Sequence, residues 1–443
     1  MEQFDKSTPM RALLVSCVFP PEPMTSASTS HALAQELARR GHDVTVIAPY
    51  PNRPGGRVYP GFRRRWFGCS RESGCVRVIR CFSTTSRTSS LASRLFENVT
   101  FGLSCGLAMA VLRRPDVIYL NTWPIFASGI AALVAMFRRI PMVVSVQDIY
   151  PESLVSLGRL RQESILSRLL RLVDVRIARL ASDVVVISRR LERIYSSDRG
   201  IPAEKLHLIA NWRRREEPSG AENTRLCRKE WRIRPGAFLF LFAGNVAAAC
   251  GVEGVIETIS SLPAEPPIRL VVAGSGSALE KCRNVAIREN CERTVFSGPF
   301  AAQETLPILS AADVLILPTQ GDQSLVSMPS KLISYMLAAR PVLAVARAES
   351  DLANIIRESG CGWVVEPGDS EQLAKRMRAA ALMDRPELAR MGLLGRKYAL
   401  AYFSTEACLP EAIGVMEKAM GAKRRISAAS KLAQANAASW EPR

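Results

Sequence analysis

The sequence predicts an α/β protein made of two doubly wound, Rossmann-like domains that face a central cleft. Short β-branched runs alternate with amphipathic helical stretches along most of the chain, a pattern typical of parallel sheets covered by helices. The runs form two groups, separated at residues 213–220 by a charged stretch that contains Pro and Gly. The chain has 443 residues, which is enough for two domains of roughly 100–200 residues each and a tail.

The predicted strands follow one another at the spacing of βαβ units. We expect a helix over residues 28–40 that Gly41 closes, because glycine adopts the left-handed conformation in which many helices end. The strands expected in the first half are residues 11–18, 44–48, 76–82, 117–121, 142–147 and 184–188. Those expected in the second half are residues 238–243, 268–273, 294–297, 314–318, 342–345 and 362–365.

The charge is strongly basic and unevenly distributed. Lys and Arg number 59 and Asp and Glu number 41, a formal net charge of +18, of which residues 1–218 carry +14 and residues 219–443 carry +4. Such a charge favours partners that bear phosphates: nucleic acid, anionic lipid headgroups or phosphorylated small molecules. We expect no nucleic-acid binding, because the basic residues are not interleaved with stacking aromatic side chains and no recognition motif is present.

The cysteine and histidine content argues against a disulfide framework and against a metal site. The 11 cysteines are odd in number and match no zinc-binding spacing, and the chain has only three histidines. We therefore expect free thiols in a reduced cytosol and no metal.

The apolar runs are too short to cross a membrane. Residues 12–19 imitate the core of a signal peptide but lack a cleavage site, so a buried first strand is the favoured interpretation. The longest internal runs, residues 101–112 and 125–137, fall short of the roughly 20 residues that span a bilayer.

Candidate ligand-binding residues of the second half follow the predicted strands. Ligands of doubly wound sheets lie at the carboxyl ends of strands, with phosphates at helix N-termini. Gly244 and Asn245 end one strand and Gly274 ends the next; glycine there permits a close approach of a diphosphate, although any tight turn also favours it. Ser330 and Lys331 begin a predicted helix, and a lysine opposed to the helix dipole suggests a bound phosphate, with a solvated lysine as the equal alternative.

The first half offers two candidate loops. Thr25 and Ser26 lead into the helix that carries His31, and their hydroxyls either bind an anion or sugar or cap the helix. Asp148 and Glu152, four residues apart after a buried strand, either activate an acceptor hydroxyl or cap the next helix.

Seven short motifs run in order along nearly the whole chain, and together they resemble glycosyltransferase family 4, which has the GT-B fold. Within this family the chain is similar to the exopolysaccharide, O-antigen and colanic-acid-type branch. The motifs are residues 19–23, 40–46, 51–61, 148–153, 211–212, 243–245 and 329–332.

The resemblance implies a retaining enzyme that needs no metal, with a nucleotide-diphosphate sugar as donor. It implies a first domain over residues 1–218 for the acceptor, with Asp148 and Glu152 as catalytic residues and Thr25, Ser26 and His31 on the acceptor side. It implies a second domain over residues 219–404 for the donor and a helix over 405–420 that returns to the first domain. Residues 421–443 carry few large apolar side chains, so their composition predicts a basic, disordered tail. The donor-binding residues are Gly244, Asn245, Gly274, Ser330, Lys331 and Ser334.

Some family positions differ in this chain. Asn245 and Cys250 stand where many relatives carry Arg and Lys, Val326 and Ser334 stand where the family has paired glutamates, and Thr25-Ser26 replaces a Gly-Gly. An active transferase, with a UDP-sugar as donor, and a degenerate homologue that binds sugar nucleotide or assists assembly without turnover both remain open.

The expected acceptor is a glycan on a polyprenyl diphosphate, or another saccharide, which predicts a peripheral protein at the cytoplasmic face of the membrane. Residues 61–72 contain three arginines beside Trp66 and Phe67, a combination that suits anionic headgroups. Arginine pairs also close the runs 101–112 and 125–137, although we expect the second of these runs to be buried in the core.

Overall fold

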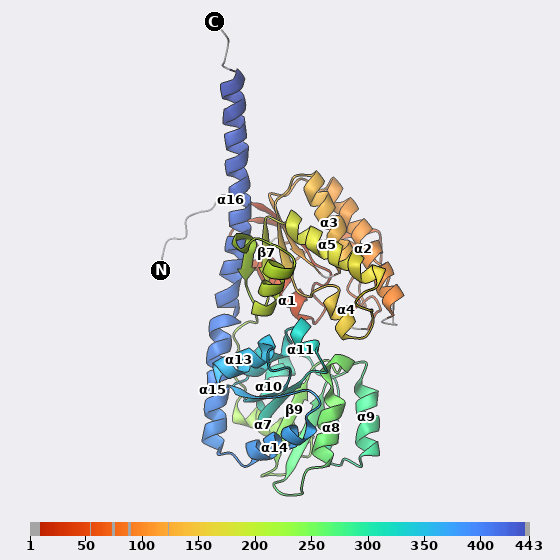
Figure 1. Cartoon of the computed structure of the whole chain (residues 1–443), viewed down its shortest axis with the longest axis vertical. Helices are drawn as coiled ribbons and strands as arrows, with labels where there is room; N and C mark the ends of the chain where they lie inside the picture. Colours follow the sequence, from red (N-terminus) through yellow and green to blue (C-terminus); the bar gives the residue numbers. More distant parts are fainter. Residues whose placement is uncertain (1–8, 54, 73–75, 87–89, 123, 439–443) are drawn as a thin grey trace. The chain divides into compact units, whose positions relative to one another are not determined.

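The computed structural model describes residues 9–53, 55–72, 76–86, 90–122 and 124–438. Contacts divide the chain into two compact units, Met1–Pro151 with Arg161–Asn211 and Cys408–Arg443, and Glu152–Leu160 with Trp212–Ala407. Each unit is a sheet covered by helices (Figure 1), so the predicted α/β class with two doubly wound domains is confirmed. The stretch at 213–220 belongs to the second unit, where Arg213 N–H donates to the Phe403 carbonyl and Arg396 pairs with Glu217.

The sheet of the first unit has eight strands in the order β3-β4-β2-β1-β5-β6-β7-β8. All neighbours are parallel except β3, which runs antiparallel to β4 at the edge. The strands are β1 (Arg11–Val15), β2 (Asp43–Pro49), β3 (Phe67–Arg71), β4 (Arg77–Cys81), β5 (Val117–Asn121), β6 (Met142–Val146), β7 (Asp183–Val186) and β8 (Leu206–Leu208). The six predicted strands are present, and β3 and β8 are additional.

The helices of the first unit lie between its strands. In α1 the buried residues recur at helical spacing and include Leu33 and Leu37, and Gly41 follows the helix at φ +86° as expected. The helices are α1 (Thr25–Arg39), α2 (Leu91–Val111), α3 (Ile125–Phe137), α5 (Ile165–Leu180) and α6 (Arg189–Arg193), with a π-helical turn at Ile194–Asp198 and a 3₁₀ turn at Ala203–Lys205.

The sheet of the second unit has six parallel strands in the order β11-β10-β9-β12-β13-β14. Strand β9 reads Phe-Leu-Phe-Leu-Phe-Ala and is buried throughout, as a central parallel strand covered on both faces should be. The strands coincide with the six predicted ranges: β9 (Phe238–Ala243), β10 (Ile268–Ala273), β11 (Thr294–Ser297), β12 (Val314–Pro318), β13 (Val342–Val345) and β14 (Gly362–Val365).

The helices of the second unit cover this sheet and include a short segment from the middle of the chain. They are α4 (Glu152–Ser156), α7 (Ala221–Glu230), α8 (Val252–Ser260), α9 (Leu279–Arg288), α10 (Thr305–Ser310), α11 (Gln323–Val326), α12 (Lys331–Leu337), α13 (Asp351–Ser359), α14 (Ser370–Ala381) and α15 (Arg385–Tyr402), with 3₁₀ turns at Ala248–Cys250 and Ala302–Glu304.

The last helix, α16 (Thr405–Ala438), joins the first unit from Cys408 onward. Its Lys418 ammonium lies 3.1 Å from the Asp183 carboxylate, and its Glu417 lies 4.0 Å from Arg40. The helix continues through residues for which the sequence predicts a disordered tail from 421, because that segment is rich in Ala and also contains Lys and Arg, which are strong helix formers. Residues 439–443 of the predicted tail lie outside the described residues.

No helix in the described part of the chain combines the length and the apolar content that crossing a bilayer requires.

Candidate active site

Two glycine turns, at the ends of β9 and β10, lie in close backbone contact in the second unit. Gly244 has φ +120° and Gly274 has φ +132°, conformations that residues with a side chain rarely adopt. A Cβ atom on Gly274 would lie 2.1 Å from the Gly244 carbonyl oxygen, and one on Gly276 would lie 2.2 Å from the Val246 carbonyl oxygen. These positions therefore admit only glycine, and the exposed residues Asn245 and Ser275 directly follow Gly244 and Gly274 at the carboxyl ends of the two strands.

Lys331 lies over the first of these turns. It is the first residue of α12, as predicted, and its ammonium donates to the Asn245 carbonyl at 3.0 Å. The ammonium is also 5.0 Å from the centre of the Phe242 ring and 3.5 Å from the Cys250 sulfur. A Cβ atom on Gly244 would lie 2.9 Å from the Lys331 Cε atom. The lysine thus brings its positive charge to the loop after β9. There it lies beside Asn245 and Cys250, the two positions at which many relatives carry Arg and Lys.

Tyr335 fixes the helix that carries this lysine, and the sequence analysis missed it. Its hydroxyl donates to the Ala243 carbonyl at 3.1 Å and accepts from the Ala243 N–H at 2.8 Å. The ring is 1% exposed, and burial raises the pKa of the phenol well above its usual value. Its position four residues after Lys331, on the same side of α12, is the sequence signal that points to it.

The remaining donor-side candidates border the same loops. Ser330 is the N-cap residue of α12 and makes no side-chain cap bond, and Ser334 is partly buried one turn along the helix. Gly251, at φ +63°, is the N-cap residue of α8, and the Gln320 N–H donates to the Ala249 carbonyl at 2.9 Å. The carboxyl ends of β9, β10 and β12 therefore all contribute to one edge of this sheet.

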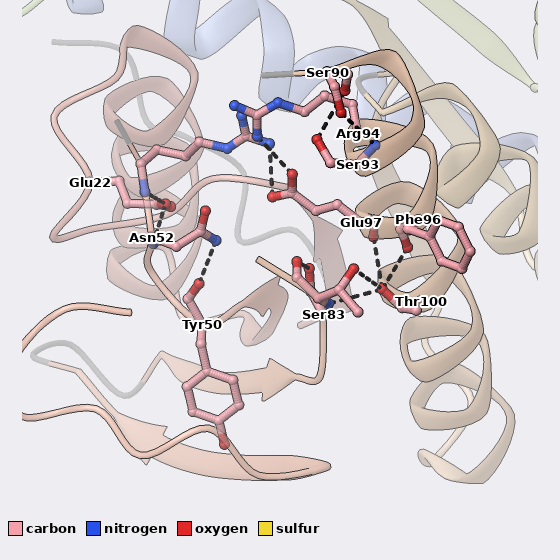
Figure 2. A network of polar contacts seen from close by, with 12 residues as sticks. Glu22, Tyr50, Asn52, Ser83, Ser90, Ser93, Arg94, Phe96, Glu97 and Thr100 are labelled. Atoms are coloured by element: carbon pink, nitrogen blue, oxygen red, sulfur yellow. Dashed lines mark hydrogen bonds and ion pairs between the residues drawn. The ribbon is translucent and has the colours of Figure 1, made fainter. Parts of the chain in front are cut away.

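A buried carboxylate, Glu22, connects two loops at the corresponding edge of the first unit. Its oxygens accept from the Phe19 N–H at 3.2 Å. They also accept from the backbone N–H groups of Asn52 and Arg53, both at 2.9 Å (Figure 2). The side chain is 3% exposed, and burial raises the pKa of the carboxyl while the N–H donors oppose the shift. Glu22 belongs to one of the family motifs, but the sequence alone predicts no role for it.

An ion-pair cluster links these loops to the start of α2. The Glu97 carboxylate accepts from Arg53 at 2.9 Å and from Arg94 at 2.7 Å (Figure 2). The Ser90 hydroxyl caps α2 by accepting from the Ser93 N–H at 3.2 Å. Because both guanidinium groups share one buried carboxylate, the cluster holds the loop after β2 against α2.

A second cluster joins the ends of β1, α1 and β5. The Asn121 amide nitrogen donates to the hydroxyls of Ser16 and Ser30, both at 3.1 Å, and these hydroxyls lie 3.2 Å apart. All three side chains are buried. The beginning of α1 is therefore positioned by hydrogen bonds that no local sequence pattern reveals.

Thr25, Ser26 and His31 lie on α1 itself. Thr25 is the first helical residue and Met24 is the N-cap residue, with no side-chain cap bond, so the capping interpretation of Thr25 and Ser26 is wrong. Both side chains are partly exposed. His31 lies edge-on to Phe19, with its Nε2 atom 3.3 Å from the Glu72 carboxylate.

Asp148 follows β6 in a loop that a buried arginine holds. Arg199 donates to the Tyr150 carbonyl at 3.0 Å and to the Asp174 carboxylate at 3.1 Å, and Tyr195 donates to the same carboxylate at 2.7 Å. Burial raises the pKa of Asp148 to about 6. Its carboxyl group therefore changes charge just below neutral pH, as a group that accepts a proton in catalysis should.

Glu152 begins α4, and the contacts assign it to the second unit while Asp148 belongs to the first. Within the second unit, the Ser156 hydroxyl at the end of α4 lies 3.3 Å from the Gln323 amide oxygen. The two carboxylates are thus four residues apart in sequence but belong to different units.

The matching family models cover both units. Residues 26–212 match the glycosyl transferase 4-like domain, and residues 237–382 match the glycosyl transferases group 1 domain. The probable glycosyltransferase WbjE of Pseudomonas aeruginosa is 29% identical over 62% of this chain and 68% of its own length. The putative colanic acid biosynthesis glycosyl transferase WcaI of Escherichia coli K12 is 25% identical over 85% of this chain and 93% of its own length.

Solved structures share the fold. HepE of Anabaena, crystallised with UDP and glucose, has a TM-score of 0.68 at 16% identity and covers 92% of this chain and 100% of its own. Sucrose-phosphate synthase of Thermosynechococcus elongatus has a TM-score of 0.74 at 17% identity and covers 93% of this chain and 100% of its own. The fold is thus that of the GT-B glycosyltransferases. The chain belongs to glycosyltransferase family 4 and is a glycosyltransferase.

Proposed function

We propose that this enzyme moves a sugar from a UDP-sugar to a polyprenyl-diphosphate-linked glycan, or to another saccharide acceptor, with retention of anomeric configuration. The observation that carries the proposal is the Lys331 ammonium held over the Gly244 turn of β9, which lies against the Gly274 turn of β10. The solved structures of HepE with UDP, and with UDP and glucose, support the choice of nucleotide. The names of WcaI and of the lipopolysaccharide enzyme WaaG support a role in cell-surface polysaccharide synthesis.

Sugar transfer requires that negative charge be stabilised on a departing diphosphate while an oxocarbenium-like centre forms. Lys331 supplies a cation in this proposal. The N–H groups of Gly244 and Gly274 donate to the Ala273 and Ser297 carbonyls, so the backbone donors come from the residues that follow these two turns and from Ser330. Asn245 and Cys250 add no positive charge where many relatives have Arg and Lys. In this proposal Lys331 therefore neutralises most of the negative charge of the diphosphate. Ser334 lies where the family has a glutamate and is assigned to the donor side.

The proposal places the acceptor on the first unit. Asp148 accepts the proton of the acceptor hydroxyl or orients that hydroxyl, since a carboxylate with a pKa of about 6 is a stronger base than an ordinary aspartate and is still mostly ionised at neutral pH. Glu152 is the second candidate catalytic carboxylate. Thr25, Ser26 and His31 contact the acceptor from α1. The loops that carry these groups are held by Glu22 and by the Ser16–Ser30–Asn121 cluster. No metal enters this scheme, and the metal independence is itself a prediction.

The proposal also locates the enzyme at the cytoplasmic face of the membrane. Residues 61–72 carry Arg63, Arg64 and Arg65, all exposed, and Trp66 is 69% exposed while its ring lies 5.1 Å from that of Phe82. Cations beside an exposed indole favour anionic headgroups.

The donor is tested by titrating the protein calorimetrically with UDP, ADP and GDP. Tighter binding of UDP by at least about tenfold, or 1.4 kcal/mol, is the expected result, and equal affinities would reject the choice of donor. The stereochemistry is tested by following the anomeric proton of the product by NMR from the first turnover. An inverted product would overturn the retaining mechanism.

A further inference from the structure

Three helices of the first unit, α2, α3 and α5, form a close-packed layer (Figure 1). Small residues let them approach: a Cβ atom on Gly102 would lie 2.8 Å from the Ala127 Cα atom, and one on Gly129 would lie 3.3 Å from the Val173 side chain. A layer packed this tightly has a continuous outer surface rather than three separate ridges.

The outer surface of α2 is apolar along its whole length. Its exposed large side chains are spaced three or four residues apart, as on one side of a helix. Among the side chains of α2 that the structure describes, none of the exposed ones is polar or charged. The large ones are Leu95 (39% exposed), Phe96 (67%), Val99 (36%), Leu103 (62%), Leu107 (53%) and Val111 (77%).

The neighbouring helices extend this surface. On α3 the exposed large residues are Leu133, Met136 and Phe137, the last 79% exposed. On α5 they include Ile165, Leu169, Leu172 and Leu180, between 41% and 86% exposed. We name the exposed apolar residues of α2, α3 and α5 the three-helix face. An apolar surface spread over three helices is larger than the scattered exposed residues of ordinary soluble surfaces.

The exposed charged residues of the three helices themselves are all basic, and an exposed acidic residue, Glu163, precedes α5. Arg113, Arg114 and Arg139 are exposed just beyond the ends of α2 and α3, and α5 exposes four further arginines, Arg168, Arg171, Arg176 and Arg179. The three helices contain two acidic residues, and both are buried in ion pairs, Glu97 with Arg53 and Asp174 with Arg199. The three-helix face therefore joins exposed aliphatic and aromatic side chains to a net positive charge.

We propose that the three-helix face is a membrane-docking surface, on which exposed Leu and Phe side chains enter the headgroup region of an anionic bilayer while the surrounding arginines contact lipid phosphates. The charge favours lipid over a second copy of the chain, because two such faces brought together would oppose like charges. This surface adds an apolar membrane contact to the one proposed for residues 61–72. The inference rests on the proposed function in one respect, that the acceptor is linked to a membrane lipid.

The test is co-sedimentation of the full chain with vesicles of phosphatidylcholine and phosphatidylglycerol, beside vesicles of phosphatidylcholine alone. The variant Leu103→Glu with Leu107→Glu places charges in the middle of the face at positions that already contact water, so the fold should tolerate it. The matched control is Leu226→Glu with Leu393→Glu, at 58% and 61% exposure on the second unit. We expect the first variant to bind anionic vesicles at least about tenfold more weakly and the control to bind like wild type.

Two results would overturn the proposal. One is equal vesicle binding by the face variant and wild type, or an equal loss in the control. The other is a wild-type dimer in sedimentation velocity that the face variant converts to monomer, which would assign the face to a second copy of the chain. Release of UDP with a water-soluble saccharide acceptor should be the same in wild type and the face variant, so failure of docking is distinguishable from failure of the proposed function.

Discussion

Replacement of Lys331 by alanine should weaken UDP binding far more than it disturbs folding. The ammonium has three N–H donors; one donates to the Asn245 carbonyl at 3.0 Å and another to the Cys250 sulfur at 3.5 Å. Loss of those bonds and of the contact with the Phe242 ring costs about 1 kcal/mol of folding free energy. A lost charge-assisted bond to a phosphate oxygen costs about 1.5–3 kcal/mol of binding free energy, which corresponds to roughly ten- to a hundredfold in affinity.

Calorimetric titration with UDP measures this loss, with the thermal midpoint of unfolding as the check on folding. Lys281→Ala is the matched control, because this lysine also lies in the second unit, on α9, and its ammonium is 3.2 Å from the Glu253 carboxylate. It should bind UDP like wild type. Unchanged UDP affinity in folded Lys331→Ala protein would remove the lysine from the donor site and refute the reasoning.

Four further perturbations test separate parts of the account. Asp148→Asn should lower turnover and leave UDP affinity intact, and a loss of UDP affinity as large as the loss of turnover would place Asp148 on the donor side. Wild-type turnover should decrease as the pH falls below about 6, because the carboxylate is then protonated. The native state binds the Asp148 proton more tightly than the unfolded chain, whose aspartates titrate near about pH 3.9. The unfolding free energy of wild type, measured by denaturant titration relative to that of Asp148→Asn, should therefore fall as the pH rises from 4 to 6. Tyr335→Phe should lower the unfolding free energy by about 1–3 kcal/mol, since the buried Ala243 N–H loses its acceptor, and no change in denaturant midpoint would contradict this. Turnover should persist in excess EDTA, whereas its loss and recovery with added Mg²⁺ would show a metal requirement. The change of Arg63, Arg64 and Arg65 together to Glu should reduce binding to anionic vesicles at moderate salt, and full retention would exclude residues 61–72 as a contact.

The sequence predicts the second sheet better than the first for a physical reason. Strands such as β9 are central, so both faces are buried and the sequence shows a continuous apolar run that identifies them. Strand β3 has the sequence Phe-Gly-Cys-Ser-Arg, which has no such pattern. It forms because β4 offers a free edge to which it pairs antiparallel, and this tertiary cause is not visible in a local window.

The site shows the same division between local and long-range signals. The sequence predicts the positions of the glycine turns at strand ends and of Lys331 at a helix start, because these depend only on the residues next to them in the chain. Glu22 could not be given a role, since its partners at Asn52 and Arg53 are about thirty residues away. The exposure of α2 was also hidden, because an apolar helical run has the same sequence whether or not another layer covers it.

The central claim is that this chain turns over a UDP-sugar although Asn245 and Cys250 replace the usual cations. The most direct measurement is release of UDP from a panel of UDP-sugars, with and without a saccharide or polyprenyl-diphosphate-linked acceptor. The account predicts acceptor-dependent release from at least one donor, lost in Asp148→Asn and reduced in Lys331→Ala. Binding of donors without release across the whole panel would contradict it and would identify the chain as a sugar-nucleotide-binding homologue without turnover.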